Sequence, residues 1–125
     1  MITGGAGFIG CHTASYFAKK GHSVTVLTGL PNYPEGKIFL EFKKNKVKYQ
    51  KLKNIKIIRV PIIPRKSNIF FLLLNYLTFS ISSIFFSIWK LKNQNFDIVF
   101  TSQYSPVFVA LTSILISKIK KIKHL

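Results

Sequence analysis

The chain has 125 residues, which is the size of one ordinary domain or of a piece of a larger one. It carries 19 Lys and Arg against 3 Asp and Glu, a formal net charge of +16, and 48% of its residues are hydrophobic. This apolar content excludes an intrinsically disordered chain, and the single cysteine excludes a disulfide-rich secreted module. With three scattered histidines and three acidic residues, the sequence also predicts no metal site.

A chain that is both basic and apolar suits two kinds of partner. Nucleic acid and the anionic face of a bilayer both attract positive charge, but only the bilayer also rewards exposed apolar surface. No recognition motif for nucleic acid is present, so we expect no nucleic-acid partner. No basic segment followed by an apolar run opens the chain, so we expect a cytoplasmic location.

The first half of the chain has the pattern of a doubly wound sheet. A glycine-rich turn follows residues 1–3, which are expected to be too short to hold a place in a sheet. A helix is predicted over 10–20, with Gly21 at its C-terminal end, then a strand over 23–27 and a turn-rich loop over 31–36. This β-α-β-loop order is typical of the opening of a Rossmann-like domain.

The second half continues in the same style. Residues 37–53 are rich in lysine and are predicted to be solvated surface. Strands are predicted over 55–60 and 96–101, and a buried helix over 107–117. Because no repeat or linker is evident, we expect a single partial domain over 1–125, of α/β class. Its core would be an incomplete Rossmann-like parallel sheet with flanking helices and a truncated first strand.

Residues 69–89 form an apolar stretch of 21 residues without a charge, long enough to cross a bilayer. Its polar residues lie on two narrow stripes of helical spacing, Asn75, Thr78 and Ser82 on one and Ser80, Ser83 and Ser87 on the other. A transmembrane span, a wholly buried core helix, and a helix packed on the sheet that dips into the membrane interface are the three alternatives. We favour the third because a span would separate two strands of one sheet, and because cations flank the stretch at Arg65, Lys66, Lys90 and Lys92.

The glycines near the N-terminus fit a dinucleotide-binding motif. Gly4, Gly7 and Gly10 satisfy G-x-x-G-x-x-G, which lets a diphosphate approach a helix N-terminus closely. Residues 1–27 resemble the start of the NAD-dependent nucleotide-sugar epimerases, which are extended short-chain dehydrogenases. That resemblance implies NAD as a cofactor. The family's acidic residue after the second strand is replaced by Thr28, and its Tyr-x-x-x-Lys spacing occurs at Tyr16…Lys20 and Tyr33…Lys37, where we interpret it as coincidence.

A second resemblance covers residues 24–125. The segments VTVLTGLPNYPEGKI (24–38), IRVPIIPRKSN (58–68), LNYLTFS (74–80) and FDIVFTSQYSPVF (96–108) resemble the N-terminal domain of family 4 glycosyltransferases. These are retaining enzymes of the GT-B fold that build bacterial capsule, O-antigen and colanic-acid-type polysaccharides. We weight this resemblance above the first because its motifs are more specific.

The second resemblance implies an acceptor-side domain that works with a donor domain for the nucleotide-sugar. Because the chain ends at Leu125, we expect that donor domain to be absent and the chain alone to transfer no sugar. No catalytic residue is assigned, and no cofactor is implied, with NAD as the alternative. The acceptor would be a lipid-linked or free saccharide, at the inner face of the cell membrane. The residues implied to flank it are Asn32, Tyr33, Glu35, Ser102, Gln103 and Ser105.

Overall fold

The structure, a computed structural model, describes residues 1–3, 8–32, 34–40, 42, 49–102 and 110–125, with backbone alone at 8 and 49–52. Within these residues the elements follow the expected alternation of strands and helices. In chain order they are β1 (Ile2–Thr3), α1 (Phe8–Lys19), β2 (Val24–Gly29), β3 (Tyr49–Leu52), β4 (Ile55–Val60), α3 (Ile69–Lys90), β5 (Ile98–Thr101), α4 (Ala110–Lys120) and β6 (Lys123–His124).

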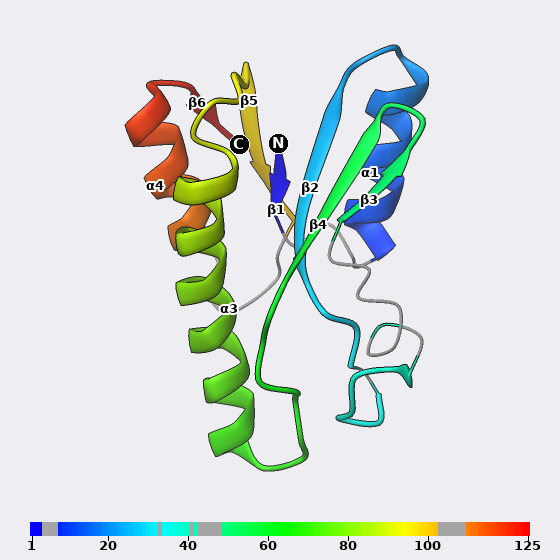
Figure 1. Cartoon of the computed structure of the whole chain (residues 1–125), viewed down its shortest axis with the longest axis vertical. Helices are drawn as coiled ribbons and strands as arrows, with labels where there is room; N and C mark the ends of the chain where they lie inside the picture. The colour runs from blue at the N-terminus through cyan, green and yellow to red at the C-terminus, as the bar shows by residue number, and fades with distance from the viewer. Residues whose placement is uncertain (4–7, 33, 41, 43–48, 103–109) are drawn as a thin grey trace.

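The strands form one sheet in the order β3-β4-β2-β1-β5-β6. The five strands from β4 to β6 are parallel neighbours, and β3 pairs with β4 antiparallel at the edge. Helices α3 and α4 cover one face of this sheet and α1 covers the other, so the sheet lies between two helical layers (Figure 1). The predicted incomplete Rossmann-like α/β fold is confirmed.

The first strand holds its place in the sheet, and the expectation that it would not is wrong. Ile2 and Thr3 pair with Val26 and Leu27 of β2 on one side and with β5 on the other. The α-ammonium group of Met1 also donates to the carbonyl oxygen of Ile98 at 2.6 Å. Two residues suffice because partners on both sides satisfy the backbone of β1, which an edge strand of this length would lack.

Alternating residues of the strands supply two hydrophobic cores. Between the sheet and the α3/α4 layer, Leu27, Ile58, Val60 and Val99 pack with Phe79 and other apolar residues. On the α1 side, the buried members are Ile2, Ala14, Val24 and Val26. Since side chains alternate along a strand, Thr28 and Arg59 belong to the α1 face, as Val26 and Ile57 do.

Helix α3 turns its small polar residues toward the protein. Asn68 caps its N-terminus, its side chain accepting from the backbone N–H of Phe70 at 2.9 Å. Ser80, Ser83 and Ser87 are buried, and the Ser83 and Thr112 hydroxyls of α3 and α4 lie 2.6 Å apart. Phe79 is buried as well, but other large apolar residues of α3, among them Ile81 and Phe85, remain exposed, so α3 is not a wholly buried core helix.

The other predicted stripe of α3 holds the chain segment that precedes the helix. The side chain of Asn75 donates to the carbonyl oxygen of Ile63, and the backbone N–H of Ile63 donates to the Thr78 hydroxyl at 3.1 Å. Here α3 continues past the carboxyl ends of the strands, beside this segment (Figure 1). The two polar stripes therefore have separate structural partners.

Three elements differ from the sequence-based expectation. The segment 37–53, expected to be surface, includes the short strand β3 at the sheet edge. The helix expected over 107–117 is described from Ala110 and continues to Lys120. A further strand, β6, begins at Lys123 and pairs with β5, and the sequence analysis predicted no strand there.

Candidate functional site

The candidate site lies at the carboxyl edge of the parallel strands, where the strand order reverses. From β1 the chain proceeds outward through β2 and β4 on one side and through β5 and β6 on the other. The backbone N–H of Ser102, just after β5, donates to the carbonyl oxygen of Thr3 at 3.0 Å. The loops after β1 and β5 thus start side by side, and open parallel sheets bind ligands at such a reversal.

The N-terminus of α1 opens onto this edge. The helix has 12 residues and no acidic residue in its first turn, so no carboxylate there repels an approaching anion. Of the predicted glycines, Gly10 is buried in the first turn of α1, whereas Gly4 and Gly7 lie outside the described residues. The end of this helix can offer backbone N–H groups to a phosphate.

Beside β1, the end of β2 has Thr28 where the epimerase pattern has an acid, and a cation lies next to it on β4. Thr28 is buried, and its register partner on β4 is Arg59, on the same face of the sheet. The guanidinium carbon of Arg59 lies 4.9 Å from the centre of the Phe42 ring, in a cation–π contact. Burial lowers the pKa of Arg59 below its ordinary value. This arrangement suits a phosphate better than a ribose diol, which a carboxylate binds.

A network of hydroxyl groups lies beneath the site on the α4 side. The hydroxyl of Thr3 is 3.1 Å from that of Ser113, which in turn is 2.5 Å from that of Thr101. Nε2 of His124 lies 2.9 Å from the Thr101 hydroxyl. As described, the network contains no carboxylate, so it forms no Ser-His-Asp arrangement. It fixes β1, β5, α4 and β6 relative to one another.

Sequence reasoning missed this network. Its members come from segments separated by up to 110 residues along the chain, as the Thr3–Ser113 pair shows. Single hydroxyl residues in apolar strands and helices have no local spacing that marks them as partners. The short length of Ile2–Thr3 and the small residues of α4 were the available signals, and neither identifies a contact.

The loop after β2 is locked to the segment after β4. The side-chain amide of Asn32 donates to the carbonyl oxygen of Leu30 at 2.9 Å, and its oxygen accepts from the backbone N–H of Arg65 at 3.0 Å. Gly36 has a φ of +65°, and a Cβ atom there would collide with the Arg65 carbonyl oxygen. The exposed side chain of Glu35 lies in the same turn.

The predicted acceptor residues therefore have different surroundings. Asn32 is buried and braces the loop, Glu35 is exposed, and Ser102 is half-buried at the start of the loop after β5. Tyr33, Gln103 and Ser105 lie outside the described residues. The described members lie at the carboxyl edge on both sides of β1, and their role in acceptor binding stays a prediction.

The Tyr16…Lys20 pair lies away from this edge. Tyr16 is exposed on α1, and Lys20 follows the C-terminal end of that helix, with its Nζ 5.9 Å from the centre of the Tyr16 ring. Within the described parts of the chain, no three His, Cys, Asp or Glu side chains come close enough to hold a metal ion. The arrangement can bind an anion, but the described residues assemble no acid–base pair at the site.

Comparison with known proteins supports one of the two resemblances. A model of the NAD dependent epimerase/dehydratase family matches residues 1–55, which is less than half of the chain. The match covers β1, α1, β2 and β3. It also extends past residue 27 into the region where the glycosyltransferase resemblance was recognised. A search of curated proteins found no match.

Proposed function

We propose that the first β-α-β unit of this chain binds the diphosphate of a nicotinamide dinucleotide, in a protein of nucleotide-sugar epimerase or dehydratase type. The observation that carries the proposal is the position of β1. This strand is paired on both sides at the reversal of the sheet and leads directly to the N-terminus of α1. The family similarity over residues 1–55 covers the same unit.

The residues present fit such a cofactor in part. The first turn of α1 would receive the diphosphate, together with the glycine positions Gly4, Gly7 and Gly10. Arg59 and Thr28 would face the ribose of the adenosine, where a cation binds a 2′-phosphate. We therefore expect NADP to bind more tightly than NAD. When bound, the nicotinamide ring accepts or donates a hydride; the chain's described residues bind and orient the cofactor.

Isothermal titration of the 125-residue chain with NADP and NAD tests this proposal. The Arg59→Gln variant should bind NADP about 10- to 100-fold more weakly, because it loses a charge-assisted hydrogen bond, and should bind NAD almost unchanged. Lys56→Gln, on the same strand and the opposite face, is the control of equal charge. The proposal fails if neither dinucleotide binds at millimolar concentration.

A second variant pair tests the glycine motif. Gly10→Val adds a branched side chain in the first turn of α1 and should weaken both dinucleotides. Gly21→Ala changes a glycine at the other end of the same helix, where φ is +89° and nothing lies within 4 Å of an added Cβ. It should cost stability without changing affinity, so equal affinity losses in the two variants would contradict the assigned binding edge.

The acceptor domain of a family 4 glycosyltransferase is a second candidate, favoured by the interlocked loops after β2 and β4. Asn32 and Gly36 hold the first loop on Arg65 of the second, and both loops belong to segments that carry that resemblance. They bring an exposed cation, Arg65, to the carboxyl edge. Such an edge suits the diphosphate of a lipid-linked sugar.

A short prenyl diphosphate separates the two candidates. Under the second one, farnesyl diphosphate binds the chain, Arg65→Gln weakens it about 10-fold, and NADP does not bind. Lys53→Gln, in the turn between β3 and β4, is the control of equal charge. Binding of NADP without farnesyl diphosphate supports the first candidate and excludes the second.

A further inference from the structure

The outward face of α3 carries a continuous apolar stripe. We define the stripe as the large exposed residues on one side of this helix, Phe70, Leu73, Leu77, Ile81, Phe85, Ile88 and Trp89. Ile81 is 68% exposed, and Phe85 and Trp89 are each 63% exposed. From Phe70 to Ile88 the stripe spans about 27 Å along the helix. Single exposed apolar residues are normal, but a continuous row of this length marks an interaction surface.

The buried side of α3 explains why this stripe stays outside. Ser83 and Ser87 face the protein, and the Ser83 hydroxyl bonds that of Thr112 on α4. Small polar residues thus share the inward side of α3 with Phe79, while the apolar stripe points outward, where a helix that covers a soluble core carries polar residues. By length and composition α3 could cross a membrane, and 17% of its apolar 18-residue window is buried inside the protein.

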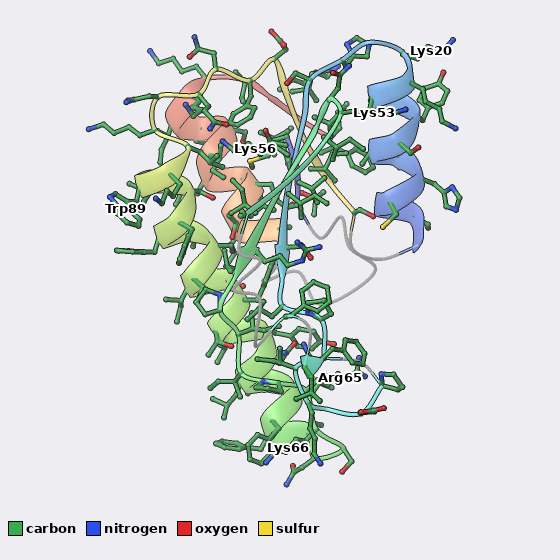
Figure 2. All side chains as sticks on the ribbon, turned by 45° about the vertical axis from the view of Figure 1, so that its right-hand side comes forward. Lys20, Lys53, Lys56, Arg65, Lys66 and Trp89 are labelled. Carbon is green, nitrogen blue, oxygen red and sulfur yellow. The ribbon has the colours of Figure 1, made fainter. Side chains whose placement is uncertain are left out.

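Positive charge brackets the stripe. The Nζ atoms of Lys66 and Lys90 each lie 4.3 Å from the centre of an aromatic ring, that of Phe71 and that of Trp89 respectively. Figure 2 shows Lys66 and Trp89 at opposite ends of α3. Ammonium groups over aromatic rings at both ends of a helix that is uncharged from Ile69 to Trp89 match the boundary between lipid headgroups and acyl chains.

We propose that α3 binds an anionic lipid membrane by lying in the plane of its interface, with the stripe in the acyl region and the flanking lysines among the headgroups. An in-plane position fits because one side of the helix is already packed against α4 and the sheet. The net charge of +16 complements anionic lipid, whereas a second copy of this chain would bring another +16 to the contact. The occupant is therefore lipid.

Trp89 is the single tryptophan of the chain and reports on the contact directly. The full chain should bind vesicles of phosphatidylcholine with 30% phosphatidylglycerol, and its fluorescence should shift to shorter wavelength and be quenched by brominated acyl chains. Vesicles of phosphatidylcholine alone should bind much more weakly. Strong binding to anionic vesicles without quenching would overturn the proposal, because the stripe would then stay out of the acyl region.

Two pairs of variants assign the contact to α3. Ile81→Asn with Phe85→Asn should weaken binding about 30-fold or more, since two largely exposed apolar anchors are lost. The control is Leu111→Asn with Ile119→Asn, which changes exposed apolar residues on α4 and should have little effect. If both pairs weaken binding equally, the stripe is not the binding surface.

The second pair of variants tests the two lysines that flank the stripe against a control variant with the same net charge. Lys66→Gln with Lys90→Gln should weaken binding about 30-fold, from roughly fivefold per lysine at an anionic surface. The control, Lys20→Gln with Lys53→Gln, removes two lysines near α1 and the β3–β4 turn, away from α3 (Figure 2). Circular dichroism confirms that each variant folds. If sedimentation shows a dimer that the stripe variant dissociates while vesicle affinity stays unchanged, the stripe is a self-association surface and the proposal is overturned.

Discussion

The hydroxyl contact between α3 and α4 is the interaction whose removal tests the packing of these two helices most directly. Ser83 and Thr112 are both fully buried, and their oxygens lie 2.6 Å apart. The Ser83 hydroxyl also lies 3.1 Å from the carbonyl oxygen of Ser80. When the Ser83 proton goes to that carbonyl, Thr112 donates to Ser83, and both hydroxyl groups are satisfied.

The structure gives unequal costs for the two single changes. Ser83→Ala leaves the Thr112 hydroxyl buried without its Ser83 partner, which should lower the free energy of unfolding by about 1–3 kcal/mol. Thr112→Val keeps the shape of the side chain, and Ser83 still bonds to Ser80, so the loss should be about 1 kcal/mol. The double variant removes both groups and should lose less than the sum, with a coupling of about 1 kcal/mol.

Urea unfolding followed by circular dichroism measures these values. For a chain of this size, a slope of about 1–3 kcal/mol per M converts 2 kcal/mol into a midpoint shift of about 1 M. The slope should be the same in all four proteins. If the two losses add to within about 0.3 kcal/mol, the hydroxyls do not interact and the assigned contact between α3 and α4 is refuted.

Three further predictions use the same unfolding assay. Gly36→Ala should lower the free energy of unfolding by about 2 kcal/mol or more, and Gly21→Ala by about 1 kcal/mol. Both glycines have positive φ, but only at Gly36 would the added Cβ meet a backbone oxygen, that of Arg65. Equal losses would show that the contact with Arg65 does not contribute. Leu27→Ala should lose about 2–5 kcal/mol, since Leu27 is fully buried in the core under α3 and α4, and a loss below 1 kcal/mol would contradict that core. Burial lowers the pKa of the Met1 α-ammonium group below 8.0, an effect that the nearby Asp97 carboxylate opposes. The unfolded chain then binds more protons between the two pKa values, so the free energy of unfolding should rise with pH in the window below 8 and level off above it; N-terminal acetylation should abolish this slope, and a fall over the same window would reverse the assignment.

The sequence predicted the elements whose periodicity is strong. The strand over 55–60 and the helix over 69–89 agree with β4 and α3 almost to the residue, because a Pro after Val60 and the Asn68 cap mark their ends. The two polar stripes of α3 were also visible in the sequence. What the sequence did not reveal is which neighbour each stripe would meet, since that depends on the topology of the sheet.

The short strands were missed for a related reason. β1, β3 and β6 contain two to four residues each and have too few positions to show an alternating pattern. Their stability comes from partners far along the chain. The same holds for the candidate site: the glycine spacing and the Thr28 replacement are local, but the juxtaposition of Thr28 with Arg59 depends on the register of β2 and β4.

The central position of β1 has a consequence for how the chain folds. β1 joins β2, about 24 residues further along, to β5, about 98 residues further along. The sheet cannot close across its middle until Ile2 and Thr3 meet β5, which is synthesised much later. Closing so long a loop is slow, and contacts of this sequence separation retard folding. On a ribosome, Ile2 could pair with β5 only after the 98 further residues up to Phe100 had been synthesised, so the two halves of the sheet would unite late.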